Sequence, residues 1–174
     1  MGDRWRPSLL GSSTYIWYPL SWNTGVPQIV AADVWSVNLA AGTYAASSGT
    51  VYEAENGVIS GSATIPSSSS FSGGKAVGYL GKGGSVTINV QGIGASQWVS
   101  LYYANGDSTW RNTTVSVNGG TSILVDQPNT GGGNVVLSVP VKLNLRSGAN
   151  SITFAANQNT YAADLDKIVV YTAS

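Results

Sequence analysis

The residues best suited to chemistry in this sequence are two pairs of carboxylates, with one residue between the members of each pair. Glu53 and Glu55 are the only glutamates in the chain, and Asp164 and Asp166 lead into its last apolar run. In a β-strand, residues i and i+2 project from the same face, with their roots about 6–7 Å apart. If the first and last strands of a β-sandwich are neighbours, three or four carboxylates converge, and such oxygen groups bind Ca²⁺. The spacing therefore favours a calcium site.

Two other interpretations of these carboxylates remain open. They could be solvated charges on edge strands, where charged side chains oppose aggregation. They could also be the two acids of a glycosidase, because catalytic carboxylates stand about 5–9.5 Å apart. Geometry opposes this last interpretation, since two groups on one strand point in parallel and do not flank a bond from opposite sides.

Composition excludes several classes of function. The 174 residues suffice for one well-buried domain and a partial second segment. Eight basic and eight acidic residues give a formal net charge of zero, so the composition provides no basic footprint for nucleic acid or anionic membrane. The chain contains no His and no Cys, which excludes His-based acid/base catalysis, the usual zinc sites and disulfides. We therefore expect a neutral ligand.

The sequence also indicates where in or outside the cell the protein is located. The sequence has no run of about 18 apolar residues that could cross a membrane, and its first residues do not resemble a signal peptide. This start suggests a cut inside a longer protein. Few charges, abundant Ser, Thr, Asn and Gly, and the N-glycosylation sequon Asn112-Thr113-Thr114 favour an extracellular location.

From Thr50 onward the sequence consists of short β-prone runs separated by Gly, Asn, Ser and Pro. Runs such as 86–90 and 113–117 place every second residue on an apolar face, as one-sided burial requires. We therefore predict an all-β fold, a β-sandwich of the jelly-roll type, with an additional short N-terminal β segment. The strands are expected near 51–55, 75–80, 84–90, 97–104, 111–117, 122–126, 134–143, 150–156 and 165–171.

Residues 1–46 differ in character from the rest of the chain. They hold four of the six tryptophans, Trp5, Trp17, Trp22 and Trp35. Strands expected at 15–18 and 34–39 are too few to cover that aromatic surface, so the segment must pack on the sandwich, on a second copy or on a missing domain. We interpret 47–49 as a linker and 50–174 as the main module.

Five motifs, in order along the chain, carry a resemblance to a known family. They are Tyr52-Glu53-Ala54-Glu55, Ser72-Gly73-Gly74-Lys75-Ala76-Val77-Gly78-Tyr79, Tyr103-Ala104-Asn105-Gly106, Val115-Ser116-Val117-Asn118-Gly119 and Asp164-Leu165-Asp166-Lys167-Ile168. Together they resemble a carbohydrate-binding module of family 35, close to family 6. The resemblance implies a jelly roll, a structural calcium between the first and last strands, and a sugar site in the loops at one end. It implies Glu53, Glu55 and Asp166 as side-chain metal ligands, joined by a backbone carbonyl near Lys75.

The same resemblance implies candidates for sugar binding. Asp164 stands where the family 6 motif often has an Asn that contacts sugar, and Tyr79 resembles an aromatic on which a sugar ring stacks. Tyr79 could also be an ordinary core tyrosine. Asn134 and Tyr161 lie in loops expected at the same end of the sandwich.

Asp107 and Arg111 are candidates through their own chemistry. A carboxylate accepts hydrogen bonds and a guanidinium donates them in a fixed fork, so the two could hold adjacent sugar hydroxyls. A simple ion pair between them is the alternative.

Trp98 alternates with strand neighbours and is expected in the core, whereas Trp110 stays unassigned. Because the loop 131–134 lacks the Trp of related modules, we expect a pocket with one stacking face, suited to a chain end.

The leading segment resembles a different family. Gly2-Asp3-Arg4-Trp5 and Ser13-Thr14-Tyr15-Ile16-Trp17-Tyr18-Pro19-Leu20 are similar to the closing part of family 43 glycoside hydrolases, of the galactan 1,3-β-galactosidase type that carries a family 35 module. This implies that residues 1–46 are the end of a hydrolase propeller, whose catalytic carboxylates would lie upstream.

The resemblances favour a non-catalytic, Ca²⁺-stabilised module that binds terminal galactose units of β-1,3-galactan and targets an exo-acting galactanase to it. The expected partner is a galactose-containing polysaccharide, with no nucleic acid and no membrane, and residues 1–46 could mediate self-association through exposed strand edges. An independent glycosidase, a module specific for mannan or uronic acid, and a purely structural β-domain remain alternatives.

Overall fold

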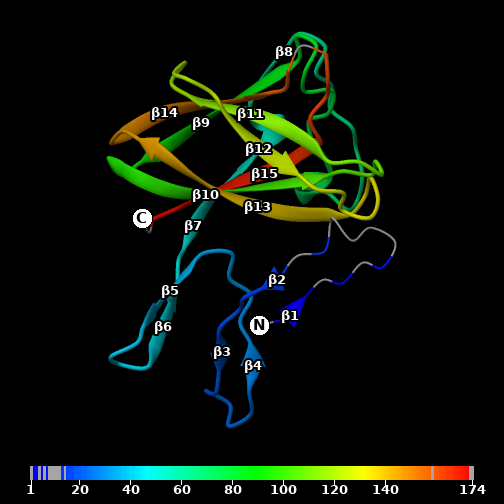
Figure 1. Ribbon diagram of the computed structural model, residues 1–174. Coiled ribbons are helices and arrows are strands. Elements are labelled where there is room, and N and C mark those ends of the chain that lie inside the picture. The colour runs from blue at the N-terminus through cyan, green and yellow to red at the C-terminus, as the bar shows by residue number, and fades with distance from the viewer. Residues whose placement is uncertain are drawn as a thin grey trace.

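The computed structural model describes residues 2–3, 5, 7, 13, 15–157 and 159–172. Two antiparallel sheets face each other as a sandwich (Figure 1). The four-stranded sheet has the order β13 (Val136–Leu145), β10 (Ala95–Ala104), β15 (Asp164–Tyr171), β7 (Gly49–Glu53). The five-stranded sheet has the order β12 (Ile123–Gln127), β11 (Arg111–Val117), β14 (Gly148–Ala155), β9 (Ser85–Gly92), β8 (Val58–Ser60). The predicted all-β sandwich of the jelly-roll type is confirmed.

Alternating apolar side chains of the two sheets fill the space between them. Val86 on β9 and Phe154 on β14 are fully buried, as are Leu101 on β10 and Ile168 on β15. Each such side chain contributes about 1.5–3 kcal/mol when it is removed from water. The alternation seen in the sequence therefore supplies the core that fixes both sheets.

Trp98 does not belong to this core, so that prediction was wrong. Val99 and Leu101 take the inward positions of β10, and the two-residue period turns Trp98 to the outer face. There it is half-buried, with the ammonium of Lys142 lying 5.4 Å from a ring centroid. The alternation of β10 is regular, but Trp98 lies on the opposite face from the one expected.

Of the strands expected from the sequence, one is absent from the structure and another ends earlier than expected. Residues 75–80 form only isolated bridges, because Tyr79 has a φ of 55°, in the left-handed region that a strand cannot contain. The first strand ends at Glu53, and Glu55 lies in the 3₁₀ turn η2 (Ala54–Asn56). Glu53 and Glu55 therefore do not share one strand face, contrary to the expectation from their spacing.

The N-terminal segment forms three two-stranded sheets outside the sandwich (Figure 1). They pair β1 (Gly2–Asp3) with β2 (Tyr15–Ile16), β3 (Leu20–Ser21) with β4 (Gln28–Ile29), and β5 (Trp35–Asn38) with β6 (Thr43–Ala46). Part of the hydrolase-like motif, at Arg4 and Thr14, lies outside the described residues. Among the described residues, no helix is long and apolar enough to cross a membrane.

The N-terminal segment contacts the outer face of the four-stranded sheet. The Tyr102 hydroxyl on β10 donates a hydrogen bond to Asp33, and the indole N–H of Trp35 donates to the carbonyl of Trp17 at 3.0 Å. Trp17 and Trp22 nevertheless remain 62% and 63% exposed. The sandwich therefore covers only part of the aromatic surface in this segment.

Candidate functional site

An acidic niche, made of Glu53, Glu55 and Asp166, surrounds the turn η3 (Ser72–Gly74). β7 and β15 pair in antiparallel, which confirms the expected contact of the first and last strands of the sandwich. The Ser72 hydroxyl donates to Glu53 Oε1 at 2.7 Å, and its backbone N–H donates to Asp166 Oδ1 at 2.7 Å. One serine therefore links carboxylates from both ends of the module.

Two carboxylate oxygens in the niche are buried and form no hydrogen bond with the described residues, Glu53 Oε2 and Glu55 Oε2. Gly73 permits this close approach. Its φ is 61°, and a Cβ there would lie 2.8 Å from Glu55 Oε1 and 4.0 Å from Glu53 Cδ. Buried anionic oxygens without partners are unfavourable, and a cation would offset that cost. An all-oxygen donor set of this kind is the one that calcium prefers.

Asp166 is only 2% exposed, and its charge is poorly compensated. Burial raises the pKa of Asp166 to about 6, against the opposing effects of the Ser72 N–H and the Lys167 ammonium; the charges of Glu53 and Glu55 raise it further. Any cation that enters the niche therefore favours the deprotonated form of Asp166.

The niche is not a complete metal cage by itself. No group of three or more His, Cys, Asp or Glu side chains is arranged to hold a metal in the part of the chain that the structure describes. Calcium takes 6–8 oxygen ligands, so backbone carbonyls and water would have to complete the set. Lys75 follows η3 directly, and a ligand role for its carbonyl stays a prediction. The oxygen donors suit calcium in kind, and binding of the ion in the niche stays a prediction.

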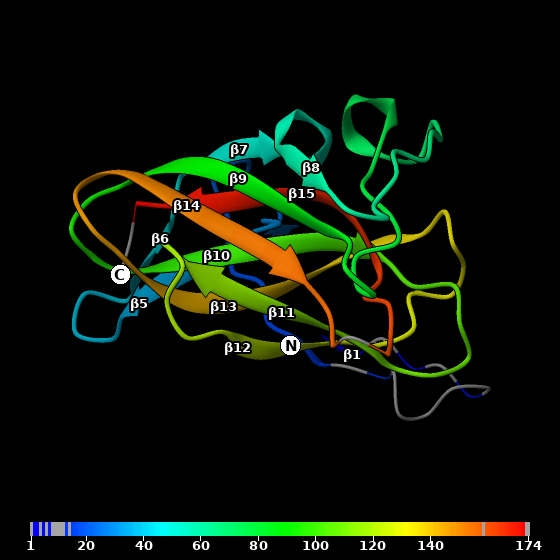
Figure 2. The ribbon, with the colours of Figure 1, turned by 90° about the horizontal axis from the view of Figure 1, so that it is seen from above.

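Loops that carry the predicted sugar-binding residues gather at one end of the sandwich (Figure 2). Arg111 Nε and Nη2 lie 2.6 and 2.5 Å from Asp107 Oδ2, and Nη1 donates to the carbonyl of Ala162 at 2.9 Å. The ion pair considered as the alternative is therefore formed. The Asp107 side chain is still 51% exposed, which leaves its second oxygen accessible to a ligand. A sugar-binding role for the pair stays a prediction.

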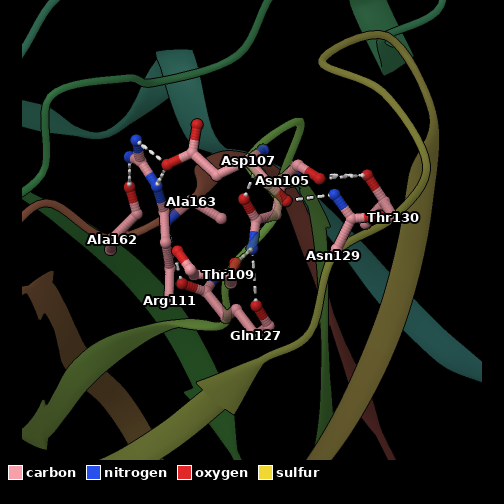
Figure 3. A network of polar contacts seen from close by, with 9 residues as sticks. All are labelled: Asn105, Asp107, Thr109, Arg111, Gln127, Asn129, Thr130, Ala162 and Ala163. Atoms are coloured by element: carbon pink, nitrogen blue, oxygen red, sulfur yellow. Dashed lines mark hydrogen bonds and ion pairs between the residues drawn. The ribbon is translucent and has the colours of Figure 1, made fainter. Parts of the chain in front are cut away.

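A network of buried polar contacts fixes the loop that carries Asp107 (Figure 3). The Asn105 side chain donates to the carbonyls of Thr109 at 3.0 Å and Gln127 at 2.9 Å, and its Oδ1 accepts the Asp107 N–H at 3.1 Å. Asn129 donates to the carbonyl of Asp107. Because these bonds hold the backbone, little loop ordering would be needed when a ligand binds.

Tyr79 is 57% exposed, so it is not a core tyrosine. Its ring meets that of Tyr161 edge to face, with centroids 5.4 Å apart and planes at 90°. The ammonium of Lys82 lies 4.7 Å from the centroid of the Tyr161 ring. The structure thus brings two predicted aromatic residues together and adds a cation beside them.

A hollow of about 330 Å³ lies among these loops, and we call it the loop hollow. Its lining includes Lys82, Asp107, Trp110, Arg111, Asn159 and Tyr161. Sequence reasoning found three of these but missed Lys82, Asn159 and Trp110. The sequence does mark Trp110, since it is a bulky aromatic residue between polar loop residues and the start of a strand. In the structure its side chain is 52% exposed. It offers the second aromatic face that the loop 131–134 does not provide.

Asp164 lies next to the loop hollow without lining it. A Cβ on Gly78 would be 2.8 Å from Asp164 Oδ1, so the glycine leaves room for this carboxylate. Burial raises the pKa of Asp164; the Arg111 guanidinium opposes this, and the Asp107 charge adds to it. Asp164 is therefore coupled electrostatically to the Asp107–Arg111 pair.

Asn134 is exposed and sits just before β13. The loop before it approaches the loop of Asp107 closely, since a Cβ on Gly106 would stand 2.7 Å from the Gly133 nitrogen. Asn134 and Tyr79 are therefore at the same end of the sandwich but outside the lining of the loop hollow. Their contact with a sugar stays a prediction.

A larger hollow of about 460 Å³ lies between the N-terminal segment and β13. It is bordered mainly by aromatic and aliphatic side chains, and Asp33 is the one charged residue among the described residues that line it. Asp33 already accepts the hydrogen bond from Tyr102. Sugar recognition needs several polar groups around an aromatic face, so the loop hollow suits it better.

A family model identifies the kind of domain. Residues 83–170 match the model described as CBM13-like, the CBM13 domain of alpha-galactosidase. The chain belongs to this CBM13-like family. The comparison with curated proteins gave no match.

Solved structures add two further likenesses to the CBM13-like domain. The exo-β-1,3-galactanase of Phanerochaete chrysosporium, solved with β-1,3-galactotriose, is 74% identical with a TM-score of 0.86; the match covers 97% of this chain and 40% of that one. A family 35 carbohydrate-binding module from Clostridium thermocellum is 28% identical with a TM-score of 0.68, over 71% of this chain and 98% of that one. The predicted resemblances are confirmed: the chain contains a carbohydrate-binding module and is similar to the C-terminal part of a galactanase. Membership of family 35 itself stays a prediction.

Proposed function

We propose that this chain carries a non-catalytic module that binds terminal galactose units of β-1,3-galactan and directs an exo-acting galactanase to that polysaccharide. The supporting observation is the 74% identity to an exo-β-1,3-galactanase over nearly the whole of this chain. That relative is longer, since this chain spans 40% of its length. The proposed hydrolase would therefore include a catalytic part outside these 174 residues.

The loop hollow supplies the chemistry that such binding needs. The free oxygen of Asp107 accepts from a sugar hydroxyl, and the Arg111 guanidinium donates from the other side. Trp110 and Tyr161 offer faces for the apolar C–H groups of a sugar ring. A hollow of about 330 Å³ suits one or two sugar units, and this matches recognition of a chain end.

The proposal includes a structural Ca²⁺ in the acidic niche. Glu53, Glu55 and Asp166 would hold the ion with a carbonyl near Lys75, and the bound charge would neutralise their buried oxygens. Binding to the folded state alone stabilises it by a few kcal/mol when free calcium is about 100–1,000 times Kd. Chelation should therefore lower the melting temperature, and an unchanged melt with no metal by elemental analysis would remove calcium from the proposal.

We further propose the boundaries expected from the sequence, with 1–46 as the end of a hydrolase domain, 47–49 as a linker and 50–174 as the module. The nine strands of the sandwich in the described part of the chain lie after residue 48, and β7 begins at Gly49, the last residue of the proposed linker. The protein is proposed to be extracellular, in keeping with a polysaccharide as ligand.

Isothermal titration calorimetry with β-1,3-galactotriose, mannotriose and a uronic-acid oligosaccharide tests the function. We expect saturable binding of galactotriose at one site per chain and weaker binding of mannotriose. Equal heats for all three, or no saturation with any, would contradict the proposed specificity. Release of galactose during the titration would instead favour the glycosidase alternative.

A further inference from the structure

Asn112 lines the loop hollow, but the proposed sugar contacts do not use it. It opens the one N-glycosylation sequon of the sequence, Asn112-Thr113-Thr114. Its side chain is partly exposed near the start of β11, and its amide forms no hydrogen bond with the residues that the structure describes. The amide is therefore available to carry a covalent glycan in the folded protein.

The two-residue period of β11 turns the sequon toward solvent. Thr113 is 1% exposed, and its hydroxyl donates to the carbonyl of Ala155 at 2.8 Å. Asn112 and Thr114 alternate with it, and both are partly exposed. The residue opposite Asn112 is Asp126, which is exposed on the edge strand β12. A glycan on Asn112 would therefore extend into solvent without displacing the core.

Trp110 lies two residues before Asn112 and lines the same hollow. In an extended chain, residues i and i+2 project to the same side, with their roots about 6–7 Å apart. The Trp110 side chain is 52% exposed, so a face of its indole is open to a neighbour. The first sugar of an N-glycan is joined directly to the asparagine amide, and its ring carries C–H groups that pack on an aromatic face. The spacing therefore places an aromatic platform beside the attachment point.

We propose that Asn112 is an N-glycosylation site, and that the first N-acetylglucosamine of the glycan packs on the indole of Trp110. The donor is a lipid-pyrophosphate oligosaccharide of the secretory pathway. Asn112 Nδ2 displaces the lipid pyrophosphate from the anomeric carbon, so that one C–N bond forms, one C–O bond breaks and the amide gives up one proton. The inference rests on the proposed extracellular location and not on sugar binding by the hollow. In the glycosylated chain, Tyr161 remains as the aromatic face for a polysaccharide end.

Occupancy of Asn112 is tested on the full chain, secreted from yeast behind a signal peptide and trimmed with endoglycosidase H, which leaves one N-acetylglucosamine on an occupied asparagine. Mass spectrometry should find this sugar on the Asn112 peptide of the wild type and of Thr114→Ser, which keeps the sequon. Thr114→Val, which removes the sequon but leaves Asn112 and Trp110 in place, should lack it. An unmodified Asn112 in the secreted wild type would overturn the site.

The contact with Trp110 is tested by melting. Each trimmed protein is compared with the same sequence made in the bacterial cytoplasm without a glycan, so that the difference reports the sugar alone. We expect the single sugar to raise the melting temperature of the wild type by about 2–4 °C and to leave that of Trp110→Ala unchanged. Trp110→Tyr should keep most of the gain, and Trp22→Ala, which removes an exposed indole from the N-terminal segment, should keep all of it. No gain in the wild type, or an equal gain in Trp110→Ala, would overturn the contact.

The outcomes for this site and for the proposed function are distinguishable. Calorimetry with β-1,3-galactotriose on the bacterial chain, in which no glycan covers Trp110, tests sugar binding by the hollow. If that chain does not bind the trisaccharide, the proposed function fails, whereas an occupied Asn112 and its effect on the melting temperature would still support the glycosylation site.

Discussion

Asp107 and Arg111 are the residues on which the proposed sugar contact depends most. They hold each other at 2.5 Å, and the buried Asn105 fixes their loop. Changing either residue to Ala removes one hydrogen-bonding partner and leaves the other without its counter-charge. Each change should weaken binding of β-1,3-galactotriose by about 1–3 kcal/mol.

The matched control for this pair is Asp126→Ala, which removes an exposed carboxylate from β12 and should leave the affinity unchanged. Calorimetry on the three single variants and on the double variant at Asp107 and Arg111 gives the comparison. Wild-type affinity in the double variant would show that the sugar binds in a different loop.

Trp110 is expected to stack on the bound sugar. It is 52% exposed at the edge of the loop hollow, so its replacement by Ala should cost little stability but lose a stacking face. We expect the free energy of galactotriose binding to weaken by about 1–3 kcal/mol, the range for an aromatic residue that contacts the ligand. Trp22→Ala, which removes a similarly exposed indole from the N-terminal segment, is the control. A loss of affinity equal in both variants would argue against a stacking role.

Asp107, Arg111 and Tyr161 line one hollow, in keeping with the end of the sandwich at which the sequence predicted them. Their contact with a sugar stays a prediction. Lys82 was missed because only the turn geometry directs it toward Tyr161, and a lysine next to glycines resembles an ordinary solvated loop residue.

At the scale of elements, η3 determines the shape of the acidic niche, and its two glycines allow a matched test. Gly73 and Gly74 both have positive φ, 61° and 78°, so an Ala at either position incurs a similar backbone cost of about 1 kcal/mol. Only at Gly73 would the new Cβ meet the carboxylate of Glu55; at Gly74 it would meet nothing within 4 Å.

We therefore expect Gly73→Ala to reduce calcium affinity well below that of Gly74→Ala. Titration of calcium into the chelated protein, followed by its effect on the melting temperature, measures the difference. If both variants bind calcium equally, η3 does not shape a metal site.

The sequence predicted the elements well where alternation is regular and poorly where the backbone bends. β11 has the bounds expected, 111–117. The strand expected at 75–80 is absent because the backbone has positive φ at Tyr79 and at the flanking Gly74 and Gly81. This conformation depends on tertiary contacts that no short sequence pattern contains. The same bend exposes Tyr79 at the loop end, so the failure of the prediction coincides with a candidate binding residue.

At the scale of the whole molecule, the sandwich should not depend on the N-terminal segment. A hydrogen bond from the Tyr102 hydroxyl to the Asp33 carboxylate joins the two parts, and a bond to a charged group is worth about 1.5–3 kcal/mol. Deleting residues 1–46 should therefore leave the fold and sugar affinity of the module nearly intact. It should also reduce self-association, because the deletion removes the large exposed side chains of Trp17 and Trp22.

Circular dichroism, calorimetry and sedimentation of the truncated and full chains check this expectation. Loss of folding or of sugar binding after truncation would place the segment inside the module and move the boundary away from Ser47.

A crystal structure of the full chain soaked with β-1,3-galactotriose would test whether the loop hollow binds the end of a β-1,3-galactan chain. We expect a galactose unit in the hollow, with hydroxyls bonded to Asp107 and Arg111 and a ring face against Trp110 or Tyr161. Sugar bound instead in the aromatic hollow beside Trp17 and Trp35, or an empty loop hollow at saturating galactotriose, would contradict it.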